Sequence, residues 1–221
     1  ERQDVRRHSH FVETCLIQAY RRHYWRALFR LASKERLAGV TVGTFFPEHP
    51  QSALVAKMRS TLELIAKYDP RQLNRLHRFV SGVLLFELIG SLGTWVEPPK
   101  LILLNEAFVA APETTDAQIA ATIVHETTHA WLEARGFAYG AGRRRRIESI
   151  CYRVQATFAR RLPDGFALAS YYEERSAGVA AQSDDEWSDS ALIAREAARL
   201  RALHVPQWFV RLYGWLTRRA A

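Results

Sequence analysis

The chain has few cysteines and no long apolar run, and both absences narrow its class. Among 221 residues there are only two cysteines, Cys15 and Cys151, and they form no CxxC pair. Two thiols are too few for the disulfide framework of a small secreted domain, so we expect a reducing, cytoplasmic location. The longest apolar stretch, residues 79–96, contains Glu87 and three glycines. This stretch is too interrupted for a membrane span and favours a buried strand followed by a turn.

Lysine is also scarce, although the chain is strongly basic. Only four of its 31 basic residues are lysines, and the formal net charge is +8. Such a charge is compatible with a nucleic-acid or anionic-membrane partner. The strong preference for arginine favours a compositional bias as the simpler interpretation. The chain begins at Glu1 without Met, which is compatible with a fragment of a protein that carries an N-terminal signal or anchor.

Hydrophobic residues make up 48% of the chain, enough for one domain with a sizeable core. We expect a single helix-rich α+β domain over 1–221, with a helical N-terminal segment 1–36, a core over about 37–162 and a helical C-terminal segment 163–221. Residues 164–190 are polar, and we expect most of them to be irregular. Helical spacing covers 10–32, 51–68, 71–78, 190–203 and 206–218, and strand composition covers 37–46, 78–87 and 99–109.

The clearest element is a helix over about 115–135. Thr115 and Gln118 match a capping box at its start, and Gly136 matches a helix stop. The sequence IVHETTHAWLEARG (123–136) contains an HExxH motif inside this helix. A second helix, about 143–161, follows after a short loop, so we expect the two helices to be antiparallel neighbours.

The HExxH motif has the spacing of a zinc site. His125 and His129 lie one helical turn apart on the same face, so both imidazoles can reach one Zn²⁺ at about 2.0–2.1 Å. Glu126 points to the adjacent sector, where it can contact a metal-bound water without being a ligand. Zinc lowers the pKa of such a water to about 7, and Glu126 can then act as the general base. Other divalent metals also accept two histidines and a carboxylate.

A catalytic zinc site needs a third protein ligand and an open position. The HExxHxxGxxH pattern with a close third histidine is absent, and the only later histidine is His204. Glu148 lies in the second turn of the following helix, where it can face His125 and His129 across a helix–helix contact. Asp164, Glu173 and Glu174 are further acidic candidates in less regular sequence.

HETTH followed after 18 residues by Glu148 resembles the pattern of the gluzincin metallopeptidases. The resemblance covers about residues 95–162 and implies a zincin-like fold with a small sheet before the active-site helix. It also implies that His125, His129 and Glu148 hold one zinc ion and that Glu126 is the general base. The Gly-Ala-Met-Glu-Asn loop and the Asn-Glu pair of the large zinc aminopeptidases are absent, so aminopeptidase specificity is not implied.

The same resemblance implies that the strand before the active-site helix, 100–109, is an edge strand that pairs with an extended peptide or protein substrate. A plain core strand is the alternative. An oxyanion-stabilising group is also expected, and the candidates are Tyr139, Tyr171, Tyr172 and His204. We expect Cys151 to be a buried core thiol and not a ligand.

These patterns predict a zinc-dependent metallopeptidase. Two alternatives remain open: an inactive metal-binding interaction protein and a nucleic-acid-associated protease. The run RRRR (143–146) is either a solvated turn or an anion-binding patch, and the apolar stripe within 205–219 either packs on the domain or contacts a membrane surface. The sequence does not indicate an oligomeric state.

Overall fold

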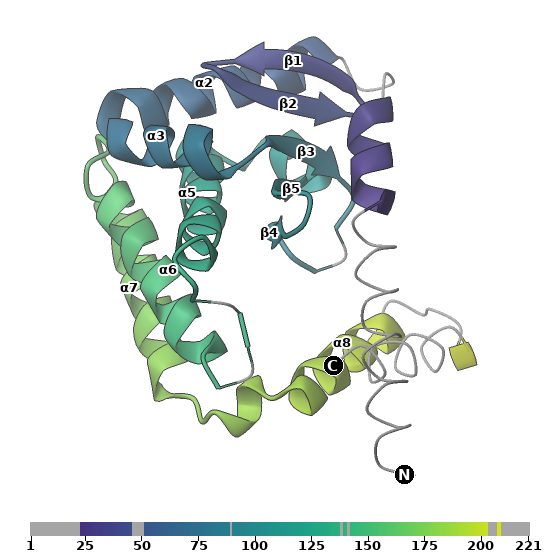
Figure 1. Ribbon diagram of the computed structural model, residues 1–221. Helices are drawn as coiled ribbons and strands as arrows, with labels where there is room; N and C mark the ends of the chain where they lie inside the picture. The colour runs from purple at the N-terminus through teal and green to yellow at the C-terminus, as the bar shows by residue number, and fades with distance from the viewer. Residues whose placement is uncertain are drawn as a thin grey trace.

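The structure is a computed structural model, and it describes residues 23–45, 51–88, 90–137, 139–140, 142–202 and 207–208. Within these ranges the chain is a helix-rich α+β fold with one mixed sheet, as predicted (Figure 1). Residues 23–31 are helical, which confirms the described part of the helix expected over 10–32. The other elements are β1 (Ser33–Leu37), β2 (Val40–Thr44), α2 (Gln51–Tyr68), α3 (Pro70–Phe79), β3 (Gly82–Phe86), β4 (Gly93–Val96), β5 (Leu101–Asn105), α4 (Glu106–Ala110), α5 (Asp116–Glu133), α6 (Arg144–Ala159), α7 (Phe166–Ala181), a 3-10 turn (Asp185–Trp187) and α8 (Asp189–Ala202).

The five strands lie in the order β1-β2-β3-β5-β4. β2, β3 and β5 run parallel, whereas β1 and β4 are antiparallel to their neighbours. The strand predicted over 37–46 is present as β2, but it is shorter than predicted, because its first residues form a hairpin turn that joins it to β1. Ala38 and Gly39 both have positive φ, 45° and 80°, as a two-residue hairpin turn requires. β1 escaped prediction because only Leu37 of its five residues is buried.

The prediction that 100–109 is an edge strand is also wrong. β5 pairs with β3 on one side and with β4 on the other, so β4 is the edge strand at this end of the sheet. β5 ends at Asn105 because the side chain of Asn105 accepts a hydrogen bond from the Ala107 amide and starts α4. Its amide group also donates to the carbonyl oxygens of Leu88 and Ser91 and holds the loop that leads into β4.

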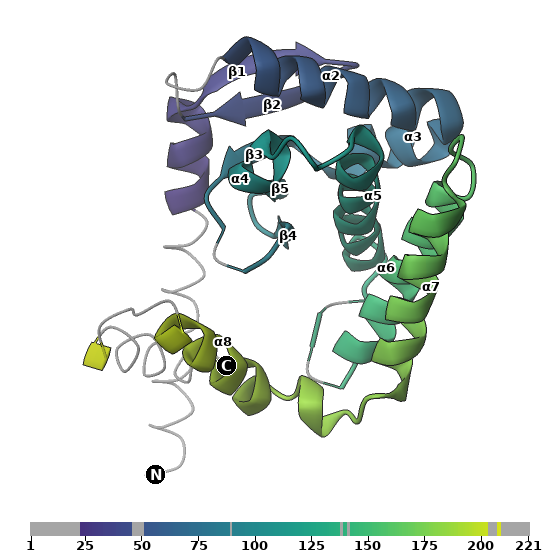
Figure 2. The same cartoon turned by 180° about the vertical axis from the view of Figure 1, so that it is seen from behind.

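Both faces of the sheet are buried. Ile102 and Leu104 of β5 belong to the main core, which includes residues of α2, α3, α5, α6 and α7. Leu101 and Leu103 point to the other face, where Phe29 of the helix at 23–31 packs against them. Viewed from either side, α5 lies between the sheet and the α6–α7 pair (Figures 1 and 2). The HExxH motif is therefore carried by the central helix of the fold.

The irregular region expected over 164–190 is wrong for most of its length, because α7 occupies Phe166–Ala181. The buried residues of α7 are Ala169, Tyr172, Ser176 and Val179, which have helical spacing. Two of the four are small or polar, so the hydrophobic periodicity of this helix is weak. The helix predicted over 190–203 is confirmed as α8.

The oxyanion candidate His204, Cys15 and the apolar stripe within 205–219, apart from residues 207–208, lie outside the described residues. Among the helices that the structure describes, none has the length and apolarity needed to cross a membrane.

Gly82, at the start of β3, offers a test of the packing between the sheet and the helix at 23–31. A Cβ atom at Gly82 would lie 2.9 Å from the carbonyl oxygen of Thr41 and closer still to the ring of Phe29. We expect Gly82→Ala to reduce the free energy of unfolding by about 1–3 kcal/mol, because overpacking forces neighbouring atoms to shift. Urea unfolding followed by circular dichroism measures this change.

Gly178 in α7 is the matched control, because nothing lies within 4 Å of an added Cβ there. Gly178→Ala is expected to stabilise the protein by about 0.5–1 kcal/mol, the ordinary gain for alanine in a helix interior. Equal effects of the two substitutions would contradict the described packing around Gly82.

Candidate metal centre

The two histidines of the HExxH motif converge at the centre of α5. The helix starts with the predicted capping box between Thr115 and Gln118, and Gly136 ends it with φ 85°. The Nε2 atoms of His125 and His129 are 3.2 Å apart, and both side chains are largely buried. One turn of helix therefore aims two ring nitrogens at the same point.

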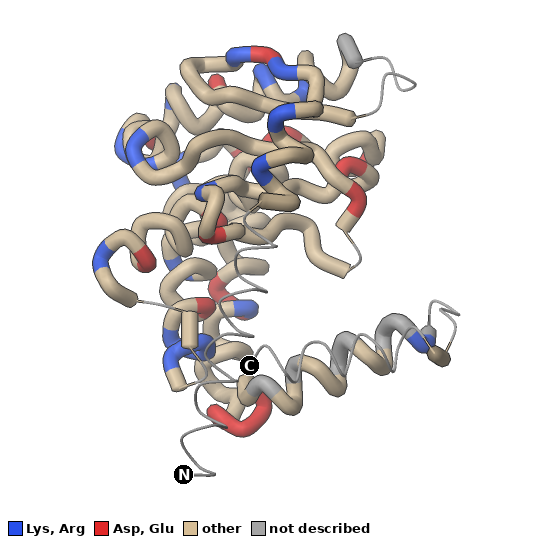
Figure 3. The backbone as a smooth tube through the Cα atoms, turned by 45° about the vertical axis from the view of Figure 1, so that its right-hand side comes forward, with Lys and Arg blue, Asp and Glu red and all other residues tan. Residues whose placement is uncertain are grey.

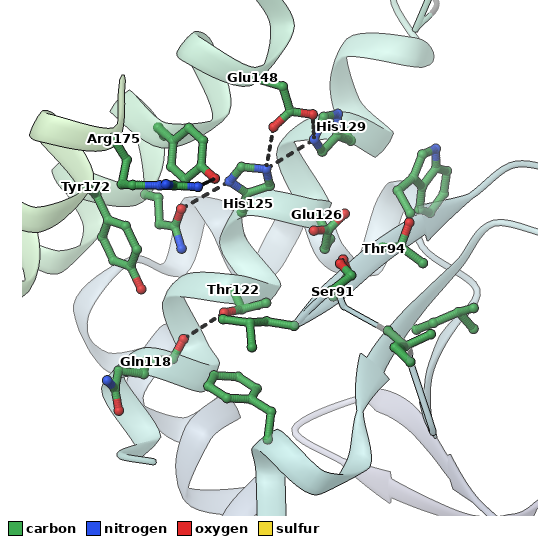
Figure 4. Close-up of a pocket in the computed structure, with 18 of the residues that line it drawn as sticks. Ser91, Thr94, Gln118, Thr122, His125, Glu126, His129, Glu148, Tyr172 and Arg175 are labelled. Carbon is green, nitrogen blue, oxygen red and sulfur yellow. Dashed lines mark hydrogen bonds and ion pairs between the residues drawn. The ribbon is translucent and has the colours of Figure 1, made fainter. Parts of the chain in front are cut away.

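Glu148 of α6 completes a triangle with these nitrogens (Figure 4). Its Oε2 lies 3.3 Å from Nε2 of His125, and its Oε1 lies 3.4 Å from Nε2 of His129. Ligand atoms about 2.0–2.2 Å from a tetrahedral zinc ion are separated by roughly 3.3–3.5 Å. The 3.2 Å between the two nitrogens is close to this separation, and Glu148 approaches each nitrogen with a different carboxylate oxygen, at 3.3 and 3.4 Å. The three side chains therefore surround one place where a small cation could bind.

Partners outside the triangle hold its members in place. Nδ1 of His125 lies 3.0 Å from Oε1 of the buried Gln155, so Nδ1–H donates to this oxygen and Nε2 keeps its lone pair for a metal. The hydroxyl group of Tyr139 donates to Oε1 of Glu148 at 2.7 Å, and its ring packs on His129. The sequence analysis missed Gln155. Its signal was its position seven residues after Glu148, two turns further along the same helix.

The charges of the site favour a cation. Burial alone would lower the pKa of His125, but its hydrogen bond to Glu148 and the nearby carboxylate charges raise it. Burial opposes ionisation of Glu148, yet the two imidazoles lower its pKa to about 2. Burial lowers the pKa of His129 to about 4. The site therefore contains an ionised Glu148 carboxylate, a neutral His129 imidazole and a His125 imidazole in surroundings that favour positive charge. A divalent cation bound between these groups would supply that positive charge.

Glu126 lies beside the triangle without belonging to it. Its side chain is buried and lines the cavity, next to β4: a Cβ atom added at Gly93 would be 3.2 Å from Cγ of Glu126. Burial raises the pKa of Glu126 to about 7, although the charge of His125 opposes this shift. A carboxyl group with this pKa can both accept and release a proton near neutral pH.

The site opens into a cavity of about 1360 Å³. β4 forms one wall, and Trp95 of this strand donates through Nε1 to Oε2 of Glu133 near the end of α5, at 2.6 Å. α6 and α7 form the opposite wall, and Figure 4 shows Tyr172 and Arg175 of α7 on the far side of His125 from Thr94 of β4.

The other residues predicted as metal ligands or oxyanion-stabilising groups differ in whether they line the cavity. Asp164 lines the cavity, whereas Glu173 forms an ion pair with Arg160 and Glu174 is exposed outside the cavity. The oxyanion candidates Tyr139, Tyr171 and Tyr172 all line the cavity, and so does Tyr152, which the sequence analysis missed.

Part of the RRRR run has a structural role. Arg145 forms an ion pair with Asp184 at 2.8 Å and donates to the carbonyl oxygen of Ala180, and Arg144 donates to the carbonyl oxygen of Trp187. These contacts attach the segment after α7 to the start of α6.

Cys151 is a second possible donor. Its Sγ and one ring nitrogen of each histidine lie within 4.8 Å of one another. However, Cys151 is fully buried in an apolar cluster with Leu132 and Ile147, and burial raises the pKa of its thiol well above the ordinary value. Glu148 reaches both Nε2 atoms at 3.3–3.4 Å, and its pKa of about 2 keeps it ionised, so we favour it as the third ligand.

Comparisons of the chain with protein-family models, with curated proteins and with solved structures found no match. The case for a metal centre therefore depends on the geometry of the site.

Two substitutions distinguish the possible donor sets. With Glu148 as the third ligand, Glu148→Gln should weaken zinc binding by more than about 10-fold, since even outer partners of a metal site contribute that much. Cys151→Ala should leave zinc affinity unchanged. Titration with zinc and a chromophoric chelator measures both affinities. With Co²⁺, a thiolate-to-cobalt charge-transfer absorption that disappears in Cys151→Ala would instead assign Cys151 as a ligand.

Burial of Glu126 predicts a pH dependence of stability in the metal-free protein. The pKa of Glu126 is raised from 4.5 to about 7, so folding favours its protonated form. The resulting contribution to the free energy of unfolding is fully present below pH 4.5 and is lost as the pH rises through 7. Glu126→Gln abolishes this ionisation. With a chelator present, we expect the variant to be more stable than the wild type at pH 8, by up to ~3 kcal/mol, and equally stable near pH 4.5.

Urea unfolding at the two pH values measures this difference. Glu174→Gln, at an exposed position outside the cavity, is the control and should show no such gap. A gap between wild type and Glu126→Gln that is the same at both pH values would contradict the assignment.

Proposed function

We propose that this protein is a zinc-dependent metallopeptidase of zincin-like architecture. The observation that carries the proposal is the convergence of the two Nε2 atoms of His125 and His129, 3.2 Å apart, with the carboxylate of Glu148, whose two oxygens lie 3.3 and 3.4 Å from them. A glutamate that is not needed as a ligand, Glu126, lies next to them in a cavity large enough for a peptide segment. This combination is typical of metal-assisted hydrolysis of an amide bond.

The residues divide the chemistry between them. When bound, a zinc ion in this triangle would lower the pKa of a water molecule and polarise a carbonyl group. Glu126 takes the proton of the attacking water and returns it to the leaving amine. Gln155 keeps His125 in the tautomer that presents Nε2 to the site. Tyr139 restrains the Glu148 carboxylate through its hydroxyl group.

Tyr152 is the best-placed candidate for stabilising the developing oxyanion. Its ring packs 4.9 Å from that of His125, between centroids, and Nη2 of Arg175 donates to its hydroxyl oxygen at 3.3 Å. The hydroxyl proton is then free to donate into the cavity.

The cavity favours an extended peptide as the substrate. β4 borders it, and among the described strands β4 pairs only with β5, so its other edge has no strand partner there. An extended chain can add to such an edge through main-chain hydrogen bonds, which do not depend on substrate sequence. We therefore transfer the substrate-pairing role that the sequence analysis assigned to 100–109 to β4.

One alternative has an observation in its favour. If Cys151 joined the triangle as a fourth ligand, the coordination would be closed and the metal would be structural. The nucleic-acid alternative has less support, because Lys and Arg are distributed over the hairpin, α3 and α6 instead of following one element (Figure 3).

Glu126→Gln tests the proposal directly. The variant should keep the zinc content of the wild type, because Glu126 is not a ligand, and should hydrolyse a casein or peptide library about 10²–10⁴-fold more slowly. Glu174→Gln should hydrolyse at the wild-type rate. Metal analysis and a fluorogenic peptide assay provide the two measurements. A wild type that binds no zinc at micromolar metal, or a Glu126→Gln variant with full activity, would rule out the mechanism.

A further inference from the structure

One face of α7 lines the cavity. Leu168, Tyr171, Tyr172 and Arg175 follow one another at the spacing of a helix face, and all four line the cavity. Three of them are apolar or aromatic, and Arg175 is the only cation among them. An arginine at the wall of a candidate active site needs a physical explanation, because its charge is not required for packing.

Arg175 has no acidic partner among the residues that the structure describes. Other arginines of the fold are paired, such as Arg145 with Asp184 and Arg161 with Asp69. Two acidic residues precede Arg175 on α7: Glu173 pairs with Arg160, and Glu174 forms no ion pair with Arg175 in the described structure. The guanidinium group of Arg175 is thus available for an anion that the described chain does not provide.

The same group is held in a defined position. Its Nη2 donates to the hydroxyl oxygen of Tyr152, and its Cζ lies 5.5 Å from the centre of that ring. One of the five N–H groups of the guanidinium is used in this way, and the others remain available. Figure 4 shows the side chain of Arg175 extended from α7 toward His125. Tyr152 therefore fixes a cation on the α7 side of the metal triangle.

The distance between Arg175 and the triangle suits a peptide residue that lies close to the scissile bond. Tyr152 lies between the two groups, with its ring 4.9 Å from that of His125 and its hydroxyl oxygen 3.3 Å from Arg175. An extended peptide advances about 3.3–3.6 Å per residue. A peptide with its scissile carbonyl at the triangle would therefore bring a group one or two residues away to Arg175.

We propose that Arg175 recognises a carboxylate of the substrate, one or two residues from the scissile bond. This inference builds on the proposed peptidase function and specifies its substrate class. A guanidinium group matches the two oxygens of a carboxylate in a bidentate pair. Among the described residues that line the cavity, Arg175 is the one Lys or Arg side chain, so a guanidinium partner for a carboxylate lies on the α7 side. The carboxylate belongs either to an acidic side chain or to the C-terminus of the peptide.

Binding to zinc-loaded Glu126→Gln protein tests the inference without depending on turnover. Three peptides of one sequence are compared by fluorescence anisotropy: a neutral peptide with Gln and a C-terminal amide, its Gln-to-Glu version, and its free C-terminal acid. One charged peptide is expected to bind about 10- to 100-fold more tightly than the neutral one, the usual effect of a hydrogen bond to a charged group. The charged peptide with the higher affinity identifies the source of the carboxylate.

Adding Arg175→Met should reduce the ratio of charged to neutral affinity to about one. Arg175→Lys keeps the positive charge but loses the paired N–H donors of the guanidinium group, so an intermediate ratio is expected. Arg153→Met is the matched control, because Arg153 is exposed on α6, does not line the cavity, and its loss changes the net charge equally. This control should keep the full ratio. Zinc content and circular dichroism verify that each variant is folded.

Three outcomes would overturn the inference: no peptide binds, the charged peptides bind no better than the neutral one, or the preference survives Arg175→Met. Hydrolysis by the wild type is measured separately. A carboxylate preference that depends on Arg175, without any hydrolysis, would refute the peptidase proposal and leave the recognition site standing.

Discussion

The fold depends on bringing two imidazoles and a carboxylate to within 3.2–3.4 Å of one another in a largely buried place. Buried polar groups at such distances are unfavourable unless hydrogen bonds or a cation compensate their charges. The antiparallel contact of α5 and α6 creates the triangle, and the short turn that begins at Gly136 makes this contact possible. Gln155 and Tyr139 then fix the orientation of two of its members.

The sequence was most informative where local chemistry determines structure. The capping box at Thr115, the stop at Gly136 and the HExxH spacing depend on neighbours in the chain, and the structure contains each of them. Glu148 could be selected because two predicted helices with a short connection must be antiparallel. Its three alternatives, Asp164, Glu173 and Glu174, lie further along the chain, and none of them is at the triangle.

The rest depends on tertiary contacts that leave little trace in the sequence. β4 has only four residues, and its place at the sheet edge follows from pairing with β5, which comes later in the chain. α7 buries small and polar residues such as Ala169 and Ser176, so its periodicity was too weak to predict a helix. Tyr152 and Arg175 acquire a common role only because α6 and α7 pack together. The HExxH motif is thus encoded locally, whereas the walls of the cavity beside it are not.

The hydrogen bond from Trp95 to Glu133 joins the edge strand to the helix that carries the motif. A ligand strand added to β4 would therefore advance past Glu126 in increments of about 3.4 Å, with a fixed starting point. Main-chain pairing would then fix the spacing of the bound residues, and a contact such as the one proposed for Arg175 would select which of the possible registers is occupied.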